Sequence, residues 1–238
     1  MNRLYLKQNA RESLTGRKPN PILVAFLYIL ISNGINLVVN TDEISQSVIS
    51  GNWAISPPRI AIIGAALLLV NLFVSIITYG WYKYALQVSR GQEAGIGTLF
   101  DGVQMAGKVV ALTVVKSVRI FLWGLLLFIP AIIKTYAYSQ AENLLVDHPD
   151  WSVGQILRAS EDLMRGHKME LFMLEISFIG WMIGALLTMG ILNLWLNPYM
   201  SVTFANFYNQ LISYTAPVAM EEDMPQDDGP SVEDYWKN

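Results

Sequence analysis

Long apolar stretches, each about the length of a bilayer crossing, constrain this chain more than any other feature of its sequence. The clearest ones are residues 20–40, 59–86 and 169–189. A transmembrane helix needs about 20 consecutive, mostly apolar residues, and each stretch meets that requirement. Only 15% of the residues are charged, against about 25% in a typical soluble domain. The sequence therefore predicts an all-α, multi-pass membrane protein.

Two further apolar regions are too long for a single crossing. A helix over residues 108–146 would measure about 60 Å at about 1.5 Å per residue, twice the ~30 Å of a hydrocarbon core. Gly124 offers a turn in this region, and Gly190 offers one after residue 189. The resulting six predicted spans are 20–40, 59–86, 108–123, 125–146, 169–189 and 191–213. We expect them to form three helical hairpins within 20–213, with short cytoplasmic amphipathic helices between them. A five-span alternative, in which 108–146 crosses once, stays open.

Basic residues fall almost entirely on one side of the six-span arrangement. That side receives Arg3, Lys7, Arg11, Arg17, Lys18, Lys83, Arg90, Lys108, Arg158, Arg165, Lys168 and Lys237. The opposite side holds only Arg59, at the edge of a span. Because cytoplasmic loops of membrane proteins are enriched in Lys and Arg, both termini are predicted to lie in the cytoplasm. Segment 1–19 is then a cytoplasmic basic segment, and the five-span alternative would place Arg158, Arg165 and Lys168 outside.

Three similar stretches indicate an internal repeat. They are ESLTGRK at 12–18, GVQMAGK at 102–108 and EDLMRGHK at 161–168. Each contains a glycine, then a lysine, and leads into an apolar span. Ser152 and Gln155 have the spacing of a capping box at the start of a helix. Gly107 and Gly166 suit the left-handed position that follows a helix.

The charged segment LRASEDLMRGHK, residues 157–168, is predicted to be an interfacial amphipathic helix. Its apolar face, formed by Leu157 and Met164 with the preceding Ile156, is expected at the headgroup boundary or against the bundle. Arg158, Arg165 and Lys168 are candidate contacts to anionic lipid headgroups, each contributing about 1 kcal/mol near a charged leaflet. The alternative is a cytoplasmic helix that packs on the bundle and has no role in lipid binding.

Five charged side chains fall inside the predicted spans: Lys116, Arg119, Lys134, Glu142 and Glu175. A charge in the centre of a membrane helix costs about 2.5–3.5 kcal/mol on insertion scales, which makes such residues functional candidates. Lys116 and Arg119 are three residues apart and share a helix face. Alignment of Gly107 with Gly166 places Lys116 opposite Glu175, so we predict a buried network of Lys116, Arg119, Glu175 and Glu142. The bases outnumber the acids by one, and this excess could hold a lipid phosphate or another anion. Alternatively, the charges only satisfy one another, or the long basic side chains reach to the interface.

The second half of the chain carries a family resemblance. The residues concerned are Pro130, Lys134, Tyr136 and Tyr138, GHK at 166–168, SFIGW at 177–181 and NPY at 197–199. Together with the surrounding residues 121–208, they resemble the bacterial integral membrane proteins of the domain of unknown function 975 family. A fainter likeness is to the membrane domain of some glycerophosphodiester phosphodiesterases. The resemblance implies a bacterial cytoplasmic membrane and no established activity.

Signatures of catalysis and of nucleic-acid binding are absent from the sequence. It contains no P-loop, no G-x-G-x-x-G, no H-E-x-x-H and no nucleophile elbow. It has no cysteine, and its two histidines lie apart from each other, so we expect no metal site, no cofactor and no catalytic residues. The acidic segment 214–238 is predicted to be disordered, and it could dock a protein partner.

We therefore expect a non-enzymatic, membrane-organising, lipid-interacting or regulatory bundle. The alternative is a transporter that moves a lipid or an anion past the intramembrane charges. A membrane-embedded enzyme acting on lipid has the least support.

Overall fold

The computed structural model describes residues 2–38 and 57–222, and the regular structure in these residues is entirely helical. The elements in chain order are α1 (Arg3–Leu14), α2 (Pro21–Val38), α4 (Pro57–Ser89), the 3-10 helix η1 (Ile96–Val103), α5 (Ala106–Leu126), α6 (Phe128–Ala137), α7 (Ala141–Asp147), α8 (Val153–Leu163), α9 (Lys168–Ile176), α10 (Ile179–Leu187) and α11 (Asn193–Glu222). The predicted all-α class is confirmed for this part of the chain.

Among the described residues, three segments are long and apolar enough to cross a membrane. They are Gly64–Ser89 in α4, Ala106–Leu126, which is α5, and Lys168–Leu187, which comprises α9 and α10. A shorter apolar helix covers Pro21–Ser32. These segments support a membrane protein, whereas the number of crossings stays a prediction.

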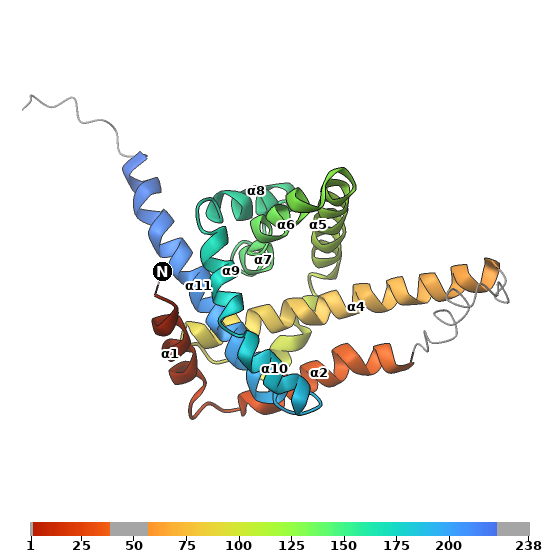
Figure 1. Cartoon of the computed structure of the whole chain (residues 1–238), viewed down its shortest axis with the longest axis horizontal. Coiled ribbons are helices and arrows are strands. Elements are labelled where there is room, and N and C mark those ends of the chain that lie inside the picture. Colours follow the sequence, from red (N-terminus) through yellow and green to blue (C-terminus); the bar gives the residue numbers. More distant parts are fainter. Residues whose placement is uncertain (1, 39–56, 223–238) are drawn as a thin grey trace, which may run out of the picture.

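Two helical hairpins and a long C-terminal helix organise the fold (Figure 1). Helices α2 and α4 lie side by side, and α5 packs against α6. Helix α11 contacts both α2 and α4, and α1 lies against α11. One core cluster joins α1, α2, α4, α5, α7, α8 and α11, and a second gathers around α9 and α11. The side chains in each core cluster therefore pack against residues from more than one helix.

The turn predicted at Gly124 lies three residues further along the chain. Gly124 is helical, and the break is at Leu127, whose backbone is extended (φ −161°, ψ 139°). Pro130 explains this position, because a proline cannot donate to the carbonyl four residues earlier and its ring clashes with that carbonyl. Helix α5 accordingly ends at Leu126. Pro130 itself lies in the first turn of α6, where backbone N–H groups have no partner within the helix.

The helix predicted over 125–146 is interrupted a second time, between α6 and α7. The buried side chain of Ser160 in α8 satisfies the backbone there, since its Oγ donates to Ala137 O at 2.8 Å and accepts from Gln140 N at 3.2 Å. The helix predicted over 169–189 is likewise interrupted between α9 and α10. Neither predicted span is therefore a continuous helix.

Helix α8 confirms much of the local prediction for the charged segment. Ser152 and Gln155 form both bonds of a capping box, and Gly166 has a left-handed φ of +84°. The prediction for Gly107 is wrong, because this residue lies in the first turn of α5. Ile156, Leu157 and Met164 are fully buried in the protein core. The apolar face of α8 therefore packs against the bundle, which is one of the two positions expected from the sequence.

The C-terminal part of the bundle begins with the predicted turn at Gly190, which has a φ of +88°. Helix α11 then continues to Glu222, so the acidic segment predicted to be disordered from residue 214 begins as helix. Residues 223–238 lie outside the described residues.

Candidate functional site

Lys116 in α5 forms an ion pair with Glu142 in α7. Its Nζ lies 2.6 Å from Glu142 Oε1, and the two side chains are 20% and 21% exposed. The other carboxylate oxygen, Glu142 Oε2, is buried and has no hydrogen-bond partner among the described residues. The sequence-predicted network contained this pair, but the alignment of repeats had placed Glu175 opposite Lys116. The structure does not bring Lys116 and Glu175 into an ion pair.

Lys134 in α6 pairs with a residue that the sequence analysis did not single out. Its Nζ lies 2.5 Å from Glu161 Oε1 in α8 and 5.5 Å from the centre of the Trp123 ring. Glu161 belongs to the amphipathic helix, whose polar face was the signal that could have found it. Lys134 therefore has its acid on a neighbouring helix, outside the predicted spans.

Glu175 and Arg119 complete the set of predicted intramembrane charges. Glu175 in α9 accepts a hydrogen bond of 2.6 Å from the hydroxyl of Tyr136. Arg119 in α5 makes no hydrogen bond or ion pair with any residue that the structure describes. In place of one network, the structure contains the separate contacts Lys116–Glu142, Lys134–Glu161 and Tyr136–Glu175.

The central cavity, of about 340 Å³, lies between α2, α4, α9, α11 and the residues around the start of α7. Its lining includes Tyr28, Trp81, Tyr82, Asn143, Glu175 and Ser201. The described lining residues contain one carboxylate and no Lys, Arg or His.

An aromatic stack fixes one wall of this cavity. Trp81 stacks on Tyr28 at 4.7 Å and on Tyr84 at 5.4 Å between ring centres. The indole Nε1 of Trp81 donates to Ser201 Oγ at 2.8 Å. The hydroxyl oxygen of Thr78 lies 3.5 Å from that of Tyr28. A second cavity, of about 220 Å³, is lined by Thr78 and Glu142, among others. Thr78 of α4 therefore lines both cavities.

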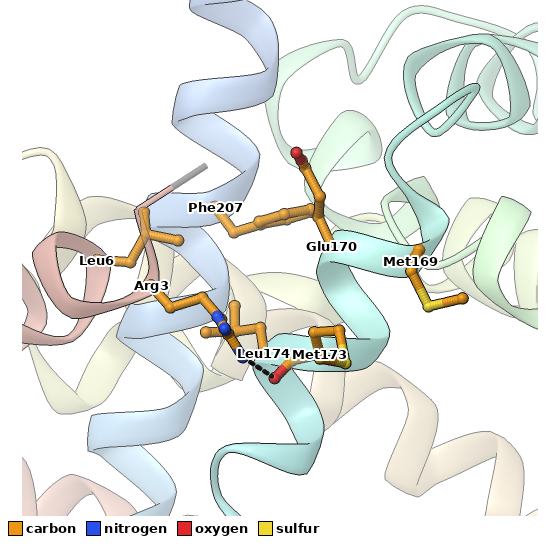
Figure 2. A pocket seen from close by; sticks show the side chains of 7 residues that line it. All are labelled: Arg3, Leu6, Met169, Glu170, Met173, Leu174 and Phe207. Atoms are coloured by element: carbon orange, nitrogen blue, oxygen red, sulfur yellow. Dashed lines mark hydrogen bonds between the residues drawn. The ribbon is translucent and has the colours of Figure 1, made fainter.

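Basic residues of α1 bind backbone carbonyls at the interruption between α9 and α10. Arg3 Nη1 donates to Met173 O at 3.3 Å, at a pocket of about 220 Å³ (Figure 2). Lys7 Nζ donates to Ser177 O at 3.0 Å and lies 3.9 Å from the centre of the Phe178 ring. Burial, together with the neighbouring Arg3, lowers the pKa of Lys7. These residues were predicted only as markers of the cytoplasmic side.

A second polar cluster, also missed from the sequence, joins α4, α7 and α11. Arg90 Nη1 and Nη2 lie 2.7 Å from the two carboxylate oxygens of Asp147. The hydroxyl of Tyr208 donates to Asp147 at 2.9 Å, and Arg90 Nε donates to Asn209 at 3.0 Å. The hydrogen bonds to Asp147 raise the pKa of Arg90 above its ordinary value. A signal did exist, because Arg90 and Asp147 follow spans predicted to end on the same side.

The predicted lipid contacts lie apart from these pairs. Arg158 is exposed on α8. Arg165 is 80% exposed and lies 2.8 Å from Asp162, and Lys168 is the first residue of α9. The described residues contain no group of three or more His, Cys, Asp or Glu side chains that could hold a metal ion.

Residues 125–215 match the family model described as protein of unknown function DUF975. The predicted resemblance to the DUF975 family is confirmed. The matched stretch runs from the end of α5 into α11 and contains Lys134, Glu142, Glu161 and Glu175. No curated protein and no solved structure matches the chain.

Proposed function

We propose that this DUF975 chain is a non-enzymatic bundle that organises or senses the membrane around it. The observation that carries the proposal is the apolar surface at two turns between helices. At the α5–α6 turn, Leu125 is 75% and Ile129 is 70% exposed. At the α10–α11 turn, Leu187 is 80% and Met189 is 97% exposed. Large exposed apolar surfaces of this kind mark contacts with membranes or other proteins.

The proposal includes six spans, both termini in the cytoplasm and a bacterial cytoplasmic membrane. Basic residues near the other ends of the helices support this orientation. Arg90 follows α4, and Lys108 lies in the first turn of α5. In the proposed orientation both are cytoplasmic, as the positive-inside rule requires.

Single cysteines test this orientation, because the native sequence has none. Met189→Cys lies at an outer turn in the proposed topology, and Asp162→Cys lies on the cytoplasmic side. The side chain of Asp162 is 67% exposed, whereas Ser160 is buried and unsuitable for labelling. We expect a membrane-impermeant thiol reagent to label Met189→Cys in intact cells and Asp162→Cys only after permeabilisation. Labelling of Asp162→Cys in intact cells would contradict the six-span arrangement.

Anionic headgroups on the cytoplasmic side are the proposed lipid partners. Arg158 and Arg165 are exposed, Arg165 in an ion pair with Asp162, and they are the proposed contacts to a charged leaflet, where each basic side chain contributes about 1 kcal/mol. The acidic tail as a docking segment for a protein partner stays part of the proposal.

The second candidate function is transport, favoured by the central cavity and by the unpartnered Oε2 of Glu142. For transport of an anion, the base in excess is Arg119, because Lys116 is paired with Glu142 and Lys134 with Glu161. A Ser201→Cys variant distinguishes the candidates. Reaction with a water-soluble thiol reagent would favour a hydrated path, and protection would favour a closed bundle.

A further inference from the structure

We infer that the central cavity binds an organic ammonium group, with the carboxylate of Glu175 as its counter-ion. This inference goes beyond the proposed function, because a bundle that organises the membrane needs no internal site for a small cationic group. It rests on the charge, the size and the lining of the cavity.

The charge argument begins with Glu175. Its hydrogen bond from Tyr136 comes from a neutral donor, which stabilises a carboxylate without cancelling its charge. Lys116 and Lys134, the lysines of the predicted spans, are paired with Glu142 and Glu161. Because an uncompensated charge inside a membrane protein is costly, a cation in the cavity would stabilise the ionised Glu175.

The size and lining favour an organic cation over a metal ion. A volume of about 340 Å³ falls at the small end of the roughly 300–1,000 Å³ of ligand pockets. Ca²⁺ takes about six to eight oxygen ligands, whereas the described lining offers one carboxylate. Tyr28 and Tyr82 instead supply aromatic surface, which attracts alkylammonium groups, while Trp81 is stacked between Tyr28 and Tyr84 and holds that wall in place.

Polar side chains complete a site that suits an amine with a short polar substituent. Asn143 is 3% exposed and donates to Gln140 Oε1 at 3.1 Å, which leaves the amide oxygen of Asn143 as an acceptor. The hydroxyl of Ser201 already accepts from Trp81 and retains its own proton for donation. The same ammonium chemistry occurs in free amino alcohols and in the headgroups of zwitterionic lipids.

The first experiment uses the full-length wild-type protein in lipid nanodiscs and two probes of equal shape. Choline carries the charge, and 3,3-dimethylbutan-1-ol is its neutral carbon isostere. We expect choline to bind at least tenfold more tightly than the isostere in equilibrium binding measurements. Glu175→Gln should weaken choline binding at least tenfold, and the control Asp162→Asn, which neutralises an exposed carboxylate on α8, should leave it unchanged.

A second arm identifies a lipid source. Wild-type protein and Glu175→Gln are equilibrated with an equimolar mixture of phosphatidylethanolamine and phosphatidylglycerol, and the retained lipids are read by native mass spectrometry. Preferential retention of phosphatidylethanolamine by the wild type alone, without binding of free choline, would assign the site to a lipid headgroup. Equal binding of choline and its isostere, together with no preferential retention of phosphatidylethanolamine by the wild type, would overturn the inference. The wild-type comparisons need no variant, so they decide the question even if Glu175→Gln does not fold.

Discussion

The close approach of α4 and η1 gives the most direct test of the packing. A methyl group at Gly80 in α4 would lie 2.2 Å from the backbone oxygen of Leu99 in η1, well inside the 3.0 Å that Cβ atoms keep from other heavy atoms. Gly102 in η1 makes the reciprocal approach, because its methyl group would lie 2.2 Å from Ile76 O. Gly80→Ala therefore requires the two elements to move apart.

The size of the effect follows from two opposing contributions. Overpacking costs about 1–3 kcal/mol, and we take the upper end because the clashing atom belongs to the backbone. Alanine stabilises a helix interior by roughly 0.5–1 kcal/mol relative to glycine. The net destabilisation of Gly80→Ala is then about 2 kcal/mol, which lowers the melting temperature of a chain of this length by about 4–8 °C.

Gly64 provides the matched control in the same helix, since nothing lies within 4 Å of the position its methyl group would take. Gly64→Ala is expected to raise the melting temperature by about 1–4 °C through helix propensity alone. The measurement is thermal unfolding in detergent, followed by fluorescence-detected size exclusion. If Gly80→Ala melts no lower than wild type while Gly64→Ala melts higher, the proposed contact between α4 and η1 is wrong.

Two predictions concern the charge pairs. Asp147→Asn weakens the contacts to Arg90 and Tyr208 and is expected to destabilise the protein by about 2 kcal/mol, because a partly buried charge loses its partner; an unchanged melting temperature would contradict this. The swap that combines Lys116→Glu with Glu142→Lys is expected to restore the expression that either single change lowers. A double variant that expresses no better than the singles would show that the pair does not stabilise the fold.

The local features of the sequence predicted the local structure well. The capping box at Ser152 and the left-handed Gly166 depend on neighbouring residues only, and both are present. The turn predicted at Gly124 lies at Leu127 instead, because Pro130, and not the glycine, interrupts the helix. The methyl position of Gly124 lies 3.6 Å from Ala131 Cβ, an ordinary contact distance, so the packing of α5 against α6 does not require a glycine there.

The candidate site was harder to predict, because its partners come from distant elements. The charged residues within the spans could be identified from the sequence. The pairing of Lys134 with Glu161, however, depends on how α8 packs against α6. Ser160 is central to that packing, since its hydroxyl replaces helical hydrogen bonds at the break before α7. No spacing rule in the sequence connects residue 160 with residues 137 and 140. Alignment of the repeats compares positions along the sequence only, so it did not identify Glu142 as the partner of Lys116.

The basic residues of the N-terminal segment link topology to packing. Arg3 and Lys7 donate to carbonyls where α9 ends, and Arg17 Nη2 donates to Val88 O, near the end of α4, at 3.0 Å. The C-terminal end of a helix has free carbonyls and a partial negative charge, so a cation there is stabilising. In the proposed topology the end of α4 is cytoplasmic, so Arg17 both marks the orientation of the chain and ties the N-terminal segment to the bundle. Helix α9 ends inside the predicted span 169–189, so Arg3 and Lys7 hold α1 against that span rather than at its cytoplasmic end. At Arg17, orientation and tertiary structure have a common electrostatic cause.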